Sequence, residues 1–458
     1  MESTPLHIQP RSLSVTTSHP KSHMKNSIEH ALSRRAFLGK TAAATAGGFL
    51  LGQAPTILRG AEDRKKLNIA LVGCGGRGSG AAGQALDADS NTQLIAMADA
   101  FSDRLETAYK NLEASQGSKV MIDPKNKFVG LDAIDKVCAM PEVDVVLLTT
   151  PPAFRAEHLK KVVAAGKHAF CEKPCATDAP GVRRFMEAAA EGKKKGLGLL
   201  SGFCYRFANG ERELMKRIHG GEIGEVRSVY GAYMGASPWE KERKPEWGDL
   251  EWQLRNWLYY TWLSGDHLVE QAIHSVDKMM WAFQDANPVR AWSVAGRQQR
   301  VEENYGNVYD HFAVCYEFEG GRLGTIFCRQ QAGTWSDNGD RIFGTKGTGR
   351  IVSFRSQGYQ NLDDTSWKYD GEKADMYQTE HNEFFASLRA GKPLHMGEQL
   401  ARSTMVGIMG RMAAYTGQVV SWDEANEAQE DLRPSEPLSW DMKLRTPPVA
   451  IPGRTKLV

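Results

Sequence analysis

The stretch LNIALVGCGGRG, residues 67–78, decides the fold of this chain. Leu67 to Val72 form a short apolar run, which is typical of a strand buried in a parallel sheet. The glycines that follow fit the pattern G-x-G-x-x-G, which allows a sharp turn and a close approach of the backbone to a pyrophosphate. A helix predicted from about Ser79 would offer its unpaired N–H groups to that anion. The stretch therefore predicts a dinucleotide-binding strand-turn-helix unit.

The alternation of strand and helix continues for more than a hundred residues. Further apolar runs that predict strands are Gln93–Ala98, Val143–Leu148, His168–Cys171 and Leu197–Phe203. One helix is predicted after Pro152, ending at about Ala165, and another is capped by Thr177 or Asp178 and ends at about Glu191. This order is typical of an α/β fold with a parallel sheet, so we expect an N-terminal Rossmann domain.

The end of the second predicted strand carries an acidic residue, Asp99. An acid at this place hydrogen-bonds the ribose 2′-hydroxyl of a dinucleotide and disfavours a 2′-phosphate. NAD is therefore the expected cofactor, while Arg104 close by leaves NADP possible. In open α/β sheets ligands bind outside the carboxyl ends of the strands, so the cofactor-binding candidates lie there or just beyond. These candidates are Gly73, Gly75, Gly76, Arg77, Gly78, Asp99, Thr149, Thr150, Pro151, His158, Glu172 and Lys173.

A polar stretch farther along the chain, SGDHLVEQAIHSVD, covers residues 264–277. If it is one helix, Glu270, His274 and Asp277 share a face, and His267 joins them one turn earlier. Oxidation of an alcohol needs a base with a pKa near neutral, for which histidine is the natural candidate. We interpret the face as catalytic. The alternatives are a metal site built from His267, Glu270 and His274, and a purely structural polar face. No metal is predicted.

The stretch WQLRNWLYYTW, residues 252–262, precedes the polar stretch and is rich in aromatic residues. Flat rings can stack on sugar faces while Arg and Asn fix hydroxyls, and ordinary core packing explains the stretch equally well. Two residues after the strand Leu197–Phe203 are added to the candidates. The substrate-binding candidates are Tyr205, Arg206, Trp257, Tyr259, Trp262, His267 and Asp277.

The rest of the chain predicts a C-terminal α+β domain. Tyr309–Phe318 alternates and pairs through Glu319–Gly321 with Arg322–Gln330 as a hairpin. A second turn signal, GTKGTG at residues 344–349, lies between two more short strands. We expect an open, mainly antiparallel sheet. The predicted boundaries are 1–60 for a disordered N-terminus with a signal peptide, 64–195 for the nucleotide domain, 196–423 for the second domain, which would bind substrate and form the oligomer contact, and 424–458 for a tail.

Composition excludes some classes of protein. The chain has 458 residues, with 57 Lys and Arg against 55 Asp and Glu. Nucleic-acid binding is therefore not expected, because it needs a clustered excess of basic residues.

Ser33–Lys40 reads SRRAFLGK and is followed by the weakly apolar run Thr41–Leu51, an order typical of a twin-arginine export signal. The run is too short for a stable membrane span. We expect a periplasmic or otherwise exported protein that meets the twin-arginine machinery.

Together, GCGGRG, Asp99, TTPP, CEKP at residues 171–174 and the stretch around His274 resemble the glucose–fructose oxidoreductase/inositol dehydrogenase/MocA family. The resemblance runs from about Leu67 to about Asp423. It implies an oxidoreductase that moves a hydride between a carbohydrate carbon and a nicotinamide, with Lys173, Glu270 and His274 as catalytic residues. The family pattern has Asp where this chain has Glu270. The resemblance also implies a homo-oligomer, a dimer or a tetramer, that pairs through the outer face of its open sheet.

Export adds a constraint on the chemistry. Reduced cofactor cannot be exchanged for fresh cofactor outside the cytoplasm, so the nicotinamide must stay tightly bound and be regenerated in place. Oxidation of one sugar with reduction of another satisfies this. Redox-assisted glycoside hydrolysis, as in the α-N-acetylgalactosaminidases of the family, also satisfies it and is the alternative. A non-catalytic sugar-binding protein is a further, less favoured alternative.

Overall fold

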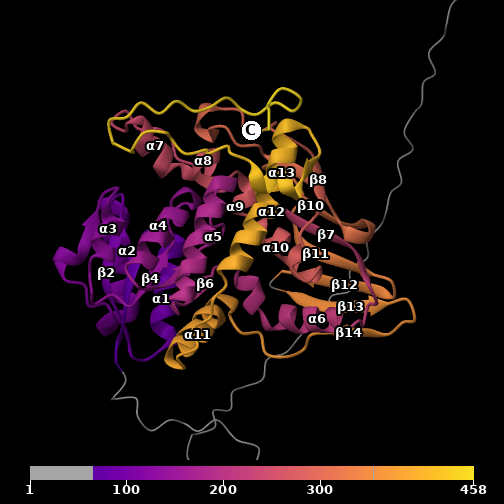
Figure 1. Ribbon diagram of the computed structural model, residues 1–458, viewed down its shortest axis with the longest axis horizontal. Helices are drawn as coiled ribbons and strands as arrows, with labels where there is room; N and C mark the ends of the chain where they lie inside the picture. Colours follow the sequence, from indigo (N-terminus) through magenta and orange to yellow (C-terminus); the bar gives the residue numbers. More distant parts are fainter. Residues whose placement is uncertain (1–64, 354, 458) are drawn as a thin grey trace, which may run out of the picture. The chain divides into compact units, whose positions relative to one another are not determined.

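The computed structural model describes residues 65–353 and 355–457, and Figure 1 shows their arrangement. The predicted export signal at residues 33–52 lies outside the described residues. Two sheets organise the described chain. The first contains six parallel strands in the order β3-β2-β1-β4-β5-β6, and the second contains nine strands in the order β14-β13-β12-β11-β7-β10-β9-β8-β15.

The six-stranded sheet is the predicted Rossmann sheet. Its strands are β1 (Leu67–Val72), β2 (Thr92–Asp99), β3 (Lys127–Val129), β4 (Val145–Leu148), β5 (His168–Cys171) and β6 (Leu199–Ser201). Its helices are α1 (Gly76–Ala88), α2 (Ser102–Gln116), α3 (Ala133–Cys138), α4 (Pro152–Ala164) and α5 (Ala179–Lys194). Asp178 caps α5, because its side chain accepts a hydrogen bond from the Gly181 N–H.

Burial on both faces explains why β1 is apolar throughout. Ile69 and Leu71 pack into the hydrophobic cluster on one side of the sheet, and Ala70 and Val72 pack into the cluster on the other. Successive side chains of a strand point to opposite faces, so a strand covered on both sides carries apolar residues at every position. The helices on both faces provide that cover and fix which strand ends reach solvent.

The nine-stranded sheet confirms the expected open, mainly antiparallel sheet. Its strands are β7 (Val226–Gly235), β8 (Arg290–Gly296), β9 (His311–Phe318), β10 (Arg322–Gln330), β11 (Asp337–Gly344), β12 (Gly347–Val352), β13 (Ser356–Asn361), β14 (Ser366–Lys368) and β15 (Val420–Ser421). β9 and β10 form the predicted hairpin, and β7 and β10 are the parallel pair in a set of otherwise antiparallel pairs. β9 alternates between buried and half-buried residues, as expected for a sheet covered on one face.

Some helices of the second half pack on this sheet, and others contact the first half of the chain. These helices are α6 (Asn209–His219), α7 (Asp249–Arg255), α8 (Thr261–Ser264), α9 (His267–Glu270), α10 (Ile273–Ala282), α11 (Met376–Arg389), α12 (Gly397–Thr416) and α13 (Trp422–Glu427). The long helix α12 lies between α5 and the second sheet (Figure 1). α11 packs against α1, so a helix from the late chain supports the nucleotide half. None of the described helices is long and apolar enough to cross a membrane.

The structure corrects one prediction about local structure. Residues 264–277 do not form one helix: α9 ends at Glu270, and α10 begins at Ile273. The N–H of Ala272 bonds to the carbonyl of His267, five residues back, so the backbone widens at Gln271 and the regular spacing is lost. Glu270 and His274 therefore lie on different helices, and the single polar face expected from the spacing is absent there.

Candidate active site

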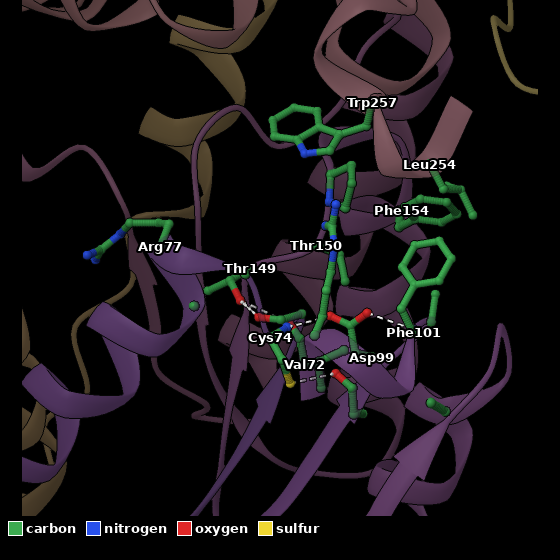
Figure 2. A pocket seen from close by; sticks show the side chains of 18 of the residues that line it. Val72, Cys74, Arg77, Asp99, Phe101, Thr149, Thr150, Phe154, Leu254 and Trp257 are labelled. Atoms are coloured by element: carbon green, nitrogen blue, oxygen red, sulfur yellow. Dashed lines mark hydrogen bonds between the residues drawn. The ribbon is translucent and has the colours of Figure 1, made fainter. Parts of the chain in front are cut away.

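A cavity of about 660 Å³ lies at the carboxyl ends of the first-sheet strands (Figure 2). All of the predicted cofactor residues except Glu172 and Lys173 contribute to its lining. The second half of the chain contributes Trp239, Lys241, Leu254 and Trp257. The strand-end rule therefore located the cavity. It did not reveal that Trp239 and Lys241, between β7 and α7, form part of the opposite wall.

The glycines of the turn after β1 differ in what they do. Gly73 has φ +97°, and a Cβ there would lie 2.7 Å from the Thr150 nitrogen. Position 73 therefore requires glycine, both for its backbone conformation and for the close approach of the segment after β4. A Cβ on Gly78 would overlap the Gly73 carbonyl oxygen. A Cβ on Gly75 would meet no protein atom within 4 Å. Gly75 also precedes α1 without a side-chain cap, so the helix leaves unpaired N–H groups beside open space. This cradle fits a pyrophosphate.

Asp99 lies in the cavity as predicted, held by two backbone donors. The Cys74 N–H donates to Oδ2 at 2.6 Å, and the Phe101 N–H donates to Oδ1 at 2.9 Å. Burial raises the pKa of Asp99, although both hydrogen bonds and Arg104 oppose the shift. The Arg104 guanidinium lies over the Phe101 ring at 5.5 Å from its centre. The carboxylate therefore has a fixed orientation beside a cation, and it can accept a further hydrogen bond from a ribose hydroxyl.

Arg77 and Glu172, both predicted to bind the cofactor, are engaged with each other. The Arg77 side chain turns away from the other labelled residues in Figure 2 and forms an ion pair with Glu172. It also lies 3.4 Å from Glu380 and over the Tyr377 ring. Burial alone would raise the pKa of Glu172, but Arg77 and Lys173 outweigh it and lower the pKa. The backbone of Arg77 still lines the cavity, whereas the pair itself fixes the turn after β5.

Lys173 and Glu270 meet beside this cavity. Leu148 of β4 pairs with Cys171 of β5, so the Thr149 and Lys173 segments leave the sheet side by side. The Lys173 Nζ donates to the backbone oxygen of Glu270 at 2.5 Å and lies 3.4 Å from Glu270 Oε1. The two side chains are only 13 % and 11 % exposed. A largely buried ammonium group is therefore oriented next to the loop that lines the cavity.

His274 completes the predicted catalytic trio from the first residues of α10. The centre of its ring lies 5.0 Å from that of Tyr205 and 6.0 Å from that of Phe203, both edge-on. Among the described residues, its Nδ1 has no hydrogen-bond partner. Burial lowers the pKa of His274 well below its ordinary value, and the charges of Lys173, Lys278 and Arg77 add to this. The imidazole is therefore neutral at neutral pH, and its lowered pKa makes it a weaker base than the near-neutral one expected from the sequence.

Two of the predicted substrate residues, Arg206 and Asp277, bind each other. The Arg206 guanidinium donates twice to Asp277, at 2.9 and 3.0 Å, and also pairs with Asp285. Asp277 is 1 % exposed and also accepts a hydrogen bond from Ser403 at 2.8 Å. The polar atoms of both side chains already have hydrogen-bond partners within the protein. We therefore assign the pair a structural role in supporting α10, outside the proposed site.

The aromatic candidates separate into lining and core residues. Trp257 lines the cavity. Tyr259 is fully buried and donates to the carbonyl oxygens of Pro238 and Trp239. Trp262 is 5 % exposed and donates through Nε1 to Gln253 at 2.7 Å. The aromatic stretch therefore combines ligand-facing and core positions, and the spacing gives no sign of which ring does which.

The structure does not assemble the alternative metal site. His267 is 2 % exposed, and its ring packs edge-on against Phe312 at 5.1 Å. Within residues 65–353 and 355–457, no group of three or more His, Cys, Asp or Glu side chains is placed to hold a metal ion. His267, predicted also as a substrate residue, therefore lies in the apolar core beside β9.

Several lining residues were missed by the sequence analysis. Phe101 lines the cavity just beyond the end of β2, where the strand-end rule would have found it, and Phe154 lines it from the first turn of α4. Trp239 and Lys241 lie in a charged stretch before α7, which has no apolar period. An isolated tryptophan in such a polar stretch was the available signal.

Comparisons with known proteins agree with this fold. A family model described as "Oxidoreductase family, NAD-binding Rossmann fold" matches residues 67–198, and one described as "GFO/IDH/MocA C-terminal domain" matches residues 212–350. The chain is 26 % identical over 252 residues to 2,7-anhydro-N-acetylneuraminate hydratase of Escherichia coli (strain K12), which covers 53 % of this chain and 63 % of the relative.

It is 31 % identical over 163 residues to inositol 2-dehydrogenase of Rhizobium meliloti (strain 1021), which covers 36 % of this chain and 44 % of the relative. The chain thus spans less than two thirds of the length of either relative. The fold also matches a crystal structure of aldose-aldose oxidoreductase from Caulobacter crescentus complexed with glycerol, with a TM-score of 0.63 and 20 % identity, over 78 % of this chain and 100 % of that one. With both halves matched by its models, the chain belongs to the Gfo/Idh/MocA family of NAD(P)-dependent oxidoreductases.

Proposed function

We propose that this protein moves a hydride between a hydroxyl-bearing carbon of a sugar or sugar derivative and a tightly bound nicotinamide. The arrangement that supports the proposal is the contact of Lys173 with Glu270, with His274 at the start of the next helix and the glycine-lined cavity at the neighbouring strand end. A cation, its carboxylate partner and a neutral imidazole are the groups that alcohol oxidation requires. Each is largely buried, so their charges act in a medium of low polarity.

The cavity supports a dinucleotide as the cofactor. The turn before α1 would hold the pyrophosphate, and Asp99 would accept hydrogen bonds from the adenosine ribose. NAD is favoured, because a 2′-phosphate would lie against the Asp99 carboxylate, while Arg104 provides the cation that NADP would need. When bound, the nicotinamide supplies the acceptor for the hydride.

The residues of the chain account for the proton. As the hydride leaves the sugar carbon, the hydroxyl proton passes to the neutral imidazole of His274. The Lys173 ammonium donates a hydrogen bond to the same oxygen and stabilises its developing negative charge. Glu270 holds Lys173 in place, since its backbone oxygen already accepts one of the three ammonium protons. In the reverse direction His274 returns the proton to the carbonyl oxygen of the sugar.

A second candidate function uses the same site without net oxidation. Transient oxidation of a sugar acidifies the neighbouring C–H, so that a substituent can be eliminated, water can add, and the carbonyl can be reduced again. One of the relatives is named a hydratase, an activity that adds water and leaves no net redox change. This favours redox-assisted hydrolysis or hydration as the alternative to transfer between two sugars.

The test is reduction of the bound nicotinamide by sugars in a single turnover. Protein that carries oxidised cofactor is mixed with a panel of aldoses, polyols and glycosides, and the absorbance of the reduced ring is followed. Lys173→Met should slow the reduction by roughly 10²- to 10⁴-fold while nucleotide content stays unchanged. Lys110→Met, at an exposed position of α2, is the matched control and should have no effect.

Each of three outcomes has a clear meaning. Unchanged reduction in Lys173→Met would reject the site assignment. Accumulation of reduced cofactor until a second sugar is added would support transfer between sugars. Cleavage or hydration of the substrate with no lasting reduction would support the second candidate.

We also propose self-association through the outer face of the second sheet. Four apolar side chains are exposed on this face: Trp292 and Val294 on β8, Leu323 on β10 and Phe343 on β11. The strand register places them on the same side of the sheet. Val294 is 78 % exposed, and a face of this kind typically marks a protein–protein contact. Val294→Asp should shift the mass measured by light scattering from a dimer or tetramer to a monomer.

Export remains a proposal that rests on the sequence SRRAFLGK at residues 33–40. Replacement of Arg34 and Arg35 by Lys should retain the protein in the cytoplasm of a host with a twin-arginine pathway. Unchanged export of that variant would contradict the proposed route.

A further inference from the structure

The C-terminal segment, residues 428–457, crosses the outside of the cavity wall. It forms neither helix nor strand and runs over α7 and α8 (Figure 1). Three of its apolar side chains, Leu438, Met442 and Leu444, pack onto a hydrophobic cluster that includes Leu254 of α7 and Phe101 of the nucleotide half. Because Leu254 and Phe101 also line the cavity, the segment lies directly behind that wall.

One end of the crossing is anchored on the nucleotide half. The Leu432 N–H donates to Oδ2 of Asp178, the capping residue of α5, at 3.1 Å. Asp431 pairs with Arg184 of α5 at 3.1 Å, and Arg433 pairs with Glu157 of α4 at 3.3 Å. Three adjacent residues of the segment are thus tied to two helices of the Rossmann sheet.

The other end is anchored on α7. The Leu444 N–H donates to Asp249 Oδ2 at 3.2 Å, and Gln253 Nε2 donates to the Leu444 oxygen at 2.8 Å. The segment contributes only backbone groups of Leu444 to both contacts. This anchor therefore depends on the path of the segment and not on one of its side chains. Between the two anchors, the Trp440 ring packs on Phe101 with the ring centres 5.6 Å apart.

What lies under the crossing is the joint between α7 and the nucleotide half. Arg255, the last residue of α7, pairs with Asp103 of α2 at 3.0 Å. Its guanidinium also covers the Phe101 ring at 4.0 Å. Separation of Arg255 and Leu254 from Phe101 would widen the cavity beside Asp99. The ion pair itself is weak, because Asp103 is 63 % exposed, so something further must hold the joint closed.

We propose that residues 431–444 act as a strap that holds α7 against the nucleotide half and makes the dinucleotide non-exchanging. The inference rests on the proposed cofactor site and adds to it the element that retains the cofactor. The two anchors lie on opposite sides of the joint and are joined by a short length of chain. This linkage raises the effective concentration of α7 at the surface of the nucleotide half. Opening then requires one anchor to break, which slows release without any contact to the ligand.

The test cuts the strap after the protein has folded. A protease recognition sequence is inserted between Ser435 and Glu436, which are exposed and lie between the anchors. A matched control carries the same sequence between Arg445 and Thr446, which are also exposed but lie beyond both anchors. Each protein is loaded with radiolabelled NAD, cut, and chased with unlabelled NAD, and the label retained on a filter is followed with time.

The strap predicts that cutting between the anchors accelerates release at least tenfold, while cutting the control changes it less than twofold. Trp440→Ala in the uncut chain should accelerate release in the same direction. Equal release rates from the two cut proteins would overturn the strap while leaving the cofactor site intact. Failure of the unmodified parent protein to bind labelled NAD would instead reject the proposed cofactor site.

Discussion

Gly75 offers the sharpest separation between folding and binding. Its backbone has φ −76° and ψ −179°, which alanine adopts without strain, and an added methyl group would meet no protein atom within 4 Å. The Gly75→Ala chain should therefore fold with unchanged stability. The methyl group would occupy the space through which the proposed pyrophosphate approaches the N–H groups of α1. Loss of one charge-assisted hydrogen bond costs about 1.5–3 kcal/mol, which weakens NAD binding roughly 10- to 150-fold.

The assay compares two quantities on the same preparations. Isothermal titration of NAD into protein stripped of nucleotide gives the affinity, and urea unfolding of the stripped protein gives the stability. Gly83→Ala, on the same helix but with only the Gln116 side chain within 4 Å of its added Cβ, is the matched control. It should leave the affinity unchanged. Wild-type affinity in Gly75→Ala would refute the placement of the pyrophosphate, and lost stability would refute the claim of free space.

Three other substitutions test separate parts of the account. Asp99→Asn should shift the preference for NADP over NAD upward by about tenfold, measured by titration, because it removes the charge that faces a 2′-phosphate. Arg206→Met should destabilise the protein by about 3–5 kcal/mol in urea without changing the KM for sugar, because it leaves Asp277 buried without its cation; a changed KM at unchanged stability would restore Arg206 to the substrate site. The third concerns pH: burial lowers the pKa of His381 from 6.5 to about 3, so stability is lost as pH falls through 6.5 toward 3. Between pH 7.5 and pH 5 the free energy of unfolding of the wild type should therefore fall by about 2 kcal/mol more than that of His381→Phe. Equal pH dependence of the two free energies, measured by urea unfolding, would contradict this.

The nucleotide half was predictable because each of its signals is local. A strand buried on both faces reads as an apolar run, and a positive φ at Gly73 leaves a visible glycine. Strand ends in a parallel sheet meet at one edge, so Asp99 and Thr149 could be placed together without any knowledge of the rest. The hairpin of β9 and β10 was likewise predictable from the alternating residues of its strands and the glycines of its turn.

The catalytic region was less predictable, because it depends on contacts between distant segments. The break at Gln271 follows from no helix-breaking residue in the sequence, so the spacing of Glu270 and His274 suggested a common face. The pairing of Arg206 with Asp277 joins residues far apart in the chain, and a charged residue near a strand end looks the same whether it meets a ligand or a partner. The composition of the tail is polar and includes Pro, while its anchors combine backbone groups at Leu432 and Leu444 with the ion pairs of Asp431 and Arg433.

Nucleotide content tests the central claim most directly. The protein is purified without added cofactor and denatured, and the released NAD(H) and NADP(H) are counted per chain. The account predicts a near-stoichiometric amount, mostly NAD(H), because the glycine cradle binds the dinucleotide, Asp99 selects it and the strap retains it. A folded protein that releases no nucleotide, and that takes up none when NAD is supplied, would contradict the account.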